Sequence, residues 1–149
     1  MKFAPLFPPK RNNYEGYMII VIVAVLLAIV STARSLVHIL FPDGGASVIA
    51  GMDLSGPLAS AVIFTFAWAG LYQLIFAIVQ WIVIVRYREF LPLVLLLIFF
   101  EQLALFIIPL FKPIAETVLT RTPPEAMANK LLLPVVLLLF LASLVKKRN

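Results

Sequence analysis

The stretch LPLVLLLIFFEQLALFIIPLF, residues Leu91–Phe111, decides how this chain folds. It is apolar and long enough to cross a bilayer, since about 20 such residues suffice in a helix. Glu101 and Gln102 nevertheless lie at its midpoint. A charged residue at the centre of a span costs about 2.5–3.5 kcal/mol, which large apolar neighbours outweigh at about −0.3 to −0.6 kcal/mol each. We therefore expect a membrane-spanning helix whose polar centre faces protein instead of lipid.

The composition of the whole chain supports a membrane protein. Of its 149 residues, 63% are hydrophobic and 13% are charged, and the mean hydropathy is +1.08. Soluble domains average about 45–50% apolar and about 25% charged residues. A soluble fold would have to bury several stretches as apolar as residues 91–111, so we expect one integral membrane domain.

Several function classes are disfavoured by the residues that the chain lacks. It has no cysteine and a single histidine, which excludes disulfides and thiolate chemistry and predicts neither a metal site nor a cofactor. The net charge of +5 comes from basic residues at the ends of apolar runs, so it does not indicate nucleic-acid binding. No nucleophile, zinc-protease or phosphate-binding motif is present, and we therefore predict a protein that is not an enzyme.

Three further apolar segments predict an all-α polytopic protein, a four-transmembrane-helix bundle. We place the spans at about 17–41, 57–85, 91–111 and 123–145, between a cationic, proline-rich arm (1–16) and a basic tail (146–149). The second span exceeds the length that a bilayer needs, which favours tilt. The short turn 86–89 predicts that spans two and three are immediate antiparallel neighbours. Pro134 predicts a kink in the last span.

Capping signals and a glycine-rich loop separate these spans. Residues 42–56 hold four of the six glycines and both aspartates, and a loop of this length is often functional or re-entrant. Asp43 and Asp53 are either solvated turn and cap residues or ligands of a hard cation. Ser55 resembles a helix cap before Pro57, and Thr122 with Glu125 resembles a capping box.

The distribution of Lys and Arg predicts the orientation of the chain. The arm, the 86–89 turn and the tail carry Lys2, Lys10, Arg11, Arg86, Arg88, Lys146, Lys147 and Arg148. The opposite side carries Lys112, Arg121 and Lys130, balanced by acidic residues. Cytoplasmic segments are the ones rich in Lys and Arg, so both termini are expected in the cytoplasm of a bacterial-type inner membrane.

Polar residues inside the spans define a candidate intramembrane cluster. At 1.5 Å per residue, Glu101 and Gln73 lie roughly 15 and 18 Å from the inner ends of their spans, at nearly one depth. The long side chain of Arg34 can reach the same level. Arg34 and His38 share a helical face, and either extend to the outer headgroups or line an outward cavity. Gln102 and Gln80 complete the cluster, and we expect Gln73 and Gln80 to hydrogen-bond between helices.

Three interpretations of Glu101 stay open at this point. It is an interhelical strut bonded to Gln73 or Arg34, a proton or cation site, or a protonated group that faces lipid. The motifs suit helix packing better than catalysis. We therefore predict a non-enzymatic accessory, structural or interaction subunit, embedded in the lipid bilayer as a homo-oligomer or within a larger membrane complex. The alternatives are a proton-coupled small-molecule transporter that uses Glu101, and a lipid- or quinone-binding membrane protein.

Overall fold

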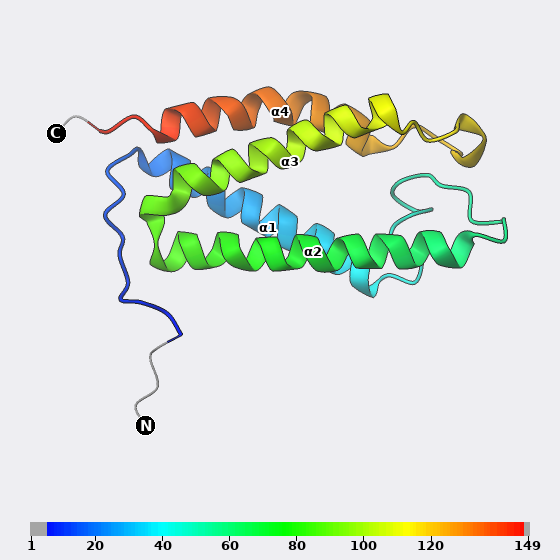
Figure 1. Ribbon diagram of the computed structural model, residues 1–149, viewed down its shortest axis with the longest axis horizontal. Helices are drawn as coiled ribbons and strands as arrows, with labels where there is room; N and C mark the ends of the chain where they lie inside the picture. Colours follow the sequence, from blue (N-terminus) through cyan, green and yellow to red (C-terminus); the bar gives the residue numbers. More distant parts are fainter. Residues whose placement is uncertain (1–5, 148–149) are drawn as a thin grey trace.

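The protein is all-helical over the part of the chain that the structure describes. In this computed structural model, residues 6–147 are described, without the side chains of residues 116 and 125–127. This part forms α1 (Met18–Leu40), α2 (Ala59–Arg86), α3 (Leu91–Phe111) and α4 (Pro124–Ser143), with 3-10 turns η1 (Arg88–Phe90) and η2 (Glu116–Val118). The helices run side by side along the long axis, and residues 6 and 147 lie at the same end (Figure 1).

Three of the four helices are long and apolar enough to cross a membrane. They are Met18–Leu40, Ala59–Arg86 and Arg88–Phe111, with mean hydropathies of 2.5, 2.0 and 2.5. The described apolar part of α4, Ala128–Ser143, is shorter. In lipid, every backbone N–H and C=O must be bonded internally, which is why such apolar segments fold as unbroken helices. The chain is thus an all-α membrane protein, and the boundaries of all four helices follow the sequence prediction closely.

Both predicted helix caps are wrong. α2 begins after Leu58, and α4 begins after Pro123; neither residue makes a side-chain capping bond. At α4 the N-cap position is Pro123, one residue after Thr122, and a proline ring has no atom that could accept a capping bond. The Glu125 side chain of the predicted capping box lies outside the described residues. Before α2, Ser55 instead belongs to a turn in which its N–H donates to Asp53 Oδ1 at 2.9 Å. Pro134 lies inside α4, and the kink predicted there stays a prediction.

α1 and α2 form a closely packed antiparallel pair. Small residues line the contact: Ala28 and Ala77 are fully buried, and Gly70 is buried against α1. A Cβ atom on Gly70 would lie 2.6 Å from His38 Cβ and 3.1 Å from the Ser35 carbonyl oxygen. Small residues of this kind let helix backbones approach in a membrane. The face of α2 that carries these small residues is therefore the face that packs on α1.

α3 packs mainly on α4, and the prediction that α2 and α3 are immediate neighbours along their length is wrong. The extensive contacts are those of α1 with α2 and of α3 with α4, whereas α2 meets α3 at few points. Figure 1 shows α2 and α3 diverging from the turn that joins them. The short turn brings the two helix ends together, but the small-residue face of α2 is occupied by α1.

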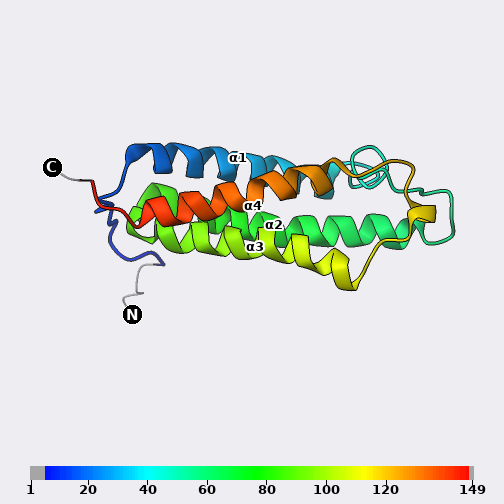
Figure 2. The same cartoon turned by 90° about the horizontal axis from the view of Figure 1, so that it is seen from above.

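The two helix pairs share one core near the basic end, which we define as the end formed by the arm, the α2–α3 turn and the end of α4. The core residues come from all four helices: Val21, Ala24, Ala28, Val83, Ile84, Leu91, Val94, Ile98 and Val136. On α3, no residue after Gln102 is buried, and on α4, no described side chain before Val136 is buried. The pairs are thus packed together over one half of their length and separate over the other (Figure 1). Seen from above, α4 runs between α1 and α3 (Figure 2).

At the opposite, distal end, two loops bind each other across the separated pairs. We call this contact between residues 48–53 and 118–121 the loop clasp. Thr120 N donates to Gly51 O at 2.7 Å, Asp53 N donates to Val118 O at 2.9 Å, and Arg121 donates to the carbonyl oxygens of Val48 and Ile49. Gly51 has a φ of +70°, and its missing Cβ leaves room for the Arg121 side chain.

The N-terminal arm crosses the basic end and is held by several contacts. Arg11 N donates to Arg86 O at 2.9 Å, and the Tyr87 hydroxyl donates to Pro8 O at 2.7 Å. Glu15 pairs with Lys146 at 2.7 Å, which lowers the pKa of the Glu15 carboxyl. Both groups are exposed, so the backbone bonds hold the arm more firmly than the ion pair does.

Candidate functional site

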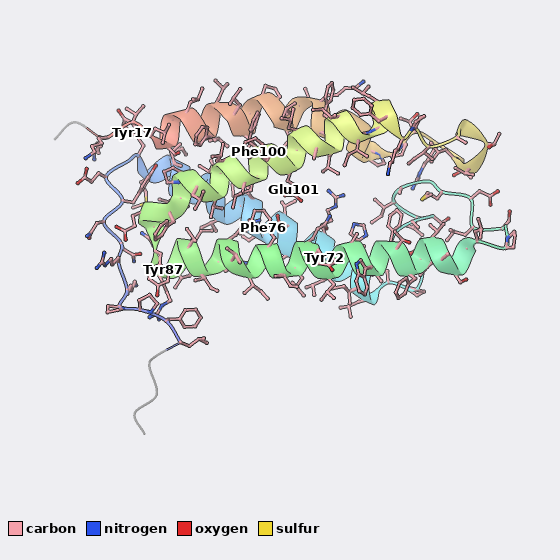
Figure 3. The ribbon with its side chains drawn as sticks, in the orientation of Figure 1. Tyr17, Tyr72, Phe76, Tyr87, Phe100 and Glu101 are labelled. Atoms are coloured by element: carbon pink, nitrogen blue, oxygen red, sulfur yellow. The ribbon has the colours of Figure 1, made fainter. Side chains whose placement is uncertain are left out.

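A cavity of about 180 Å³ lies where the two helix pairs begin to separate, just beyond the shared core. All four helices line it: Leu27, Val30, Ser31, Arg34, Gln73, Phe76, Ile98, Glu101, Gln102, Ala128, Asn129 and Leu132. Figure 3 shows Glu101 extending from α3 into the space towards α2, where Phe76 faces it. The cavity therefore joins an apolar lining to a small number of polar groups, the usual composition of a ligand site.

Glu101 and Arg34 are the two charged side chains of the cavity. Both are partly buried, and the Arg34 guanidinium interacts electrostatically with the Glu101 carboxylate. Arg34 Nε also donates to His38 Nε2 at 3.4 Å. The sequence allowed Arg34 either to extend to the outer headgroups or to line a cavity, and in the structure it lines the cavity.

Two glutamines present unpaired carbonyl oxygens at this site. Gln102 follows Glu101 on α3 and is only 7% exposed, yet its Oε1 has no hydrogen-bond partner among the described residues. Gln73 Oε1, on α2, is likewise buried and without a partner there. No hydrogen bond joins Gln73 to Glu101 within residues 6–147, so the strut that the sequence suggested between them is not formed. A buried carbonyl without a donor is unfavourable, which makes both oxygens ready to accept a bond from a ligand or water.

His38 lies outside the cavity and positions Arg34. It is 5% exposed, packed edge-on against Phe66 with ring centroids 5.4 Å apart, and its Nδ1 lies 2.7 Å from Gly44 O. A carbonyl only accepts, so Nδ1 carries the proton and Nε2 accepts from Arg34. The expectation that His38 reaches the outer headgroups or a cavity mouth is wrong, because α1 and α2 approach so closely at Gly70 that the ring is enclosed.

Gln80 is a second buried glutamine, separate from the site. It is 1% exposed on α2, and neither atom of its amide has a partner in the described chain. The predicted interhelical hydrogen bond of Gln80 is therefore not formed. Apolar core residues such as Val83 and Ile84 lie on the same buried face, which explains why no donor or acceptor reaches the amide.

The two aspartates of the distal loop act as turn residues. Asp43 accepts from the N–H groups of Gly45, Ser47 and Val48 at 2.8, 3.1 and 2.9 Å, and these bonds, the one from Val48 foremost, lower its pKa. The bond from Ser55 lowers the pKa of Asp53 in the same way. Among the described residues, no group of three or more His, Cys, Asp or Glu side chains could hold a metal ion. The hydrogen bonds therefore support Asp43 and Asp53 as turn and cap residues, and not as ligands of a hard cation.

Phe76 and Asn129 are two of the lining residues that sequence reasoning missed. In the sequence Phe76 is one more apolar residue of a span, although it lies one turn from Gln73 on the same face of α2. Asn129 lies at the start of the apolar part of α4 and directly before Lys130, so nothing in the sequence sets its amide apart from the polar start of the helix.

No protein-family model, curated protein or solved structure matches this chain. The fold and the cavity define its class: an all-helical membrane protein with a largely apolar cavity that carries a few polar groups between two helix pairs. The particular activity is inferred from the chemistry of the lining residues.

Proposed function

We propose that all four helices span an inner membrane of the bacterial type, with both termini in the cytoplasm. Two observations support this topology. α4 has 20 residues, about 30 Å of helix, which equals the thickness of the hydrocarbon core. Lys10, Arg11, Arg86, Lys146 and Lys147 all belong to the basic end, as expected for the cytoplasmic side.

Within this topology the protein acts as a non-enzymatic, proton-coupled transporter of a small solute. The observation that carries the proposal is the cavity, in which a carboxylate from α3 and polar side chains from the other three helices line one volume. Ionisable residues inside membrane spans are costly and are retained mainly where they handle protons, ions or substrates. Glu101 serves as the proton site, because it is the carboxylate that lines the cavity.

Competition between a proton and the solute for one carboxylate couples the proton flux to the solute flux. A proton and the solute both bind Glu101, so the arrival of one favours departure of the other. The shared core closes the cavity towards the basic end, while the helix pairs separate towards the distal end. Rocking of one pair against the other around this core would open the two sides in turn, which is the alternating-access motion of many transporters. Arg34 and His38 link the cavity to the distal loop through the bond from His38 to Gly44.

Flux measurements in proteoliposomes test this function. Vesicles with an acidic interior and a trapped pH dye are exposed to a panel of small cationic, neutral and anionic solutes. We expect at least one solute to accelerate proton release through the native protein. Glu101→Gln should reduce release to the rate of protein-free vesicles, because it cannot exchange a proton. The control Glu89→Gln, at an exposed residue of the basic end, should behave as the native protein does.

The proposal fails if no solute in the panel accelerates proton release, or if Glu101→Gln transports as well as the native protein. Circular dichroism and gel filtration of each variant in detergent exclude misfolding as the cause of a loss. The result that supports the proposal is that Glu101→Gln elutes like the native protein but releases protons only at the rate of protein-free vesicles, while Glu89→Gln keeps the native rate.

A specific observation favours the accessory-subunit role as a second candidate. Tyr72 lies midway along α2, is 58% exposed, and its hydroxyl has no hydrogen-bond partner in the described structure. Phe64 and Trp68 continue the same exposed row, with Trp68 and Tyr72 ring centroids 5.7 Å apart. A hydroxyl facing lipid in mid-span is unfavourable, so a partner helix with an acceptor would suit this row. Photo-crosslinking from position 72 in native membranes tests it: a defined adduct supports the role, and adducts with lipid alone contradict it.

A further inference from the structure

We infer that the cavity binds a compact primary ammonium compound, through a wall of three acceptor groups, Gln73, Glu101 and Gln102. The inference deepens the proposed function and rests on it only for the statement that the ligand is carried across the membrane. The ligand class follows from which hydrogen-bonding groups of the cavity are occupied and which are not.

The acceptor wall has three groups on two helices. Glu101 contributes a carboxylate, and Gln73 and Gln102 contribute Oε1 atoms that are buried without a partner. Gln102 is the strongest sign of a missing ligand, since it is more than nine-tenths buried and lines the cavity. Leaving a buried oxygen unsatisfied is unfavourable, and a donor in the cavity would remove that cost.

The charged donor of the cavity, Arg34, is already engaged. Arg34 bonds to His38 and interacts with Glu101, so the guanidinium is held at the α1 side of the space. A bound anion would face the carboxylate and two carbonyl oxygens at once. A primary ammonium group has three N–H donors and no acceptor, which matches three acceptors on the opposing wall.

The size and the apolar lining restrict the rest of the ligand. A cavity of about 150 Å³ lined by apolar side chains holds benzene, and this one measures about 180 Å³. Phe76 faces Glu101 across the cavity (Figure 3), and Ile98 and Leu132 add apolar surface. An aromatic ring close to a cation attracts it through the electrons of the ring face. Benzylammonium combines this size with the required head group.

Binding to the purified protein in detergent at pH 7 tests the inference with three probes of one shape. Benzylammonium carries the predicted head group, benzyl alcohol replaces it with a neutral one, and benzoate with an anionic one. We expect saturable binding by calorimetry for benzylammonium, with at least tenfold weaker binding of the other two, since a hydrogen bond to a charged group contributes about 1.5–3 kcal/mol. Equal or tighter binding of benzoate or benzyl alcohol would overturn the inference, and this comparison needs no variant.

Paired glutamine variants locate the site. Gln102→Leu and Gln73→Leu should each weaken benzylammonium binding about fivefold or more, while Gln80→Leu should leave it unchanged, because Gln80 is buried outside the cavity. The inference is wrong if Gln80→Leu weakens binding as much as the other two, or if neither wall variant has an effect.

The outcomes separate the ligand class from the transport proposal. Selective benzylammonium binding by a protein that carries no proton flux supports the ligand class and contradicts the transport function. Proton flux that depends on Glu101 without benzylammonium binding supports transport and overturns the ligand class.

Discussion

The basic half of the molecule and its distal half use the same helices in opposite ways. In the basic half, small residues such as Ala24, Ala28 and Ala77 bring α1 and α2 together, and Ile84, Val94 and Ile98 fill the space between the pairs. In the distal half, the pairs separate around Arg34 and Glu101, and the loop clasp holds their ends. The comparison teaches that the length of each apolar run determines where a span forms. The size and polarity of the side chains between two helices determine where those helices come into contact.

Overpacking the basic half should produce the largest effect on stability. Ala28→Leu places a branched side chain where Ala28 and Ala77 are both fully buried, so we expect a loss of about 3 kcal/mol, the upper end for overpacking. Thermal unfolding in detergent measures it. Ala33→Leu, on the exposed face of the same helix, is the matched control. Equal effects of the two substitutions would contradict close packing of α1 and α2.

The loop clasp should be the most sensitive element of the distal half. Gly51→Ala adds a Cβ at a φ of +70° and 2.5 Å from Arg121 Cγ, so we expect destabilisation by about 1–2 kcal/mol, the cost of a left-handed conformation for a residue with a Cβ. Faster hydrogen exchange at the Thr120 amide, which bonds to Gly51 O, reports the loss. Gly56→Ala is the control, because nothing lies within 4 Å of its Cβ position. If both variants exchange alike, the clasp does not hold the loops.

Replacing the unpaired glutamine of the basic half should stabilise the protein. Gln80→Leu removes a buried amide that has no partner in the described structure, and we expect a gain of about 1 kcal/mol from the recovered desolvation cost. Chemical unfolding in mild detergent measures the change. A destabilisation instead would indicate a bond to Gln80 from a bound water or a partner. Gln102→Leu sharpens the comparison, since it should stabilise similarly but also weaken ligand binding.

The smallest expected effect is the pH dependence of the distal loop. The pKa of Asp43 is lowered from its usual 3.8 by backbone N–H bonds to the ionised form. Its contribution is therefore present above pH 3.8 and is lost as the pH falls through the lower, folded-state pKa. Asp43→Asn should cost about 0.5 kcal/mol at pH 7, the low end for a capping side chain. The difference from the native protein should vanish at low pH; a difference that persists there would refute the ionic origin.

The site was only partly accessible to sequence reasoning. Depth along the spans sufficed to bring Glu101, Gln73 and Arg34 to one level, because the rise per residue of a helix is constant. It could not separate His38 and Gln80 from them, since depth says nothing about which way a residue faces. Gly70 is an example, because the absence of a side chain there lets α2 approach α1 closely enough to enclose His38. This enclosure becomes visible only when both helices are in place.

The sequence by itself determined the helices of this protein. Runs of apolar residues, ended by proline, glycine and basic clusters, set where α1 to α4 begin and end, because an unpaired backbone is prohibitively costly in lipid. Only the tertiary structure decided that α1 pairs with α2 and α3 with α4, and that the cavity lies between the pairs. The physical reason is that every span offers apolar surface on all sides. Partner choice then depends on how small and polar side chains from distant parts of the chain fit against one another.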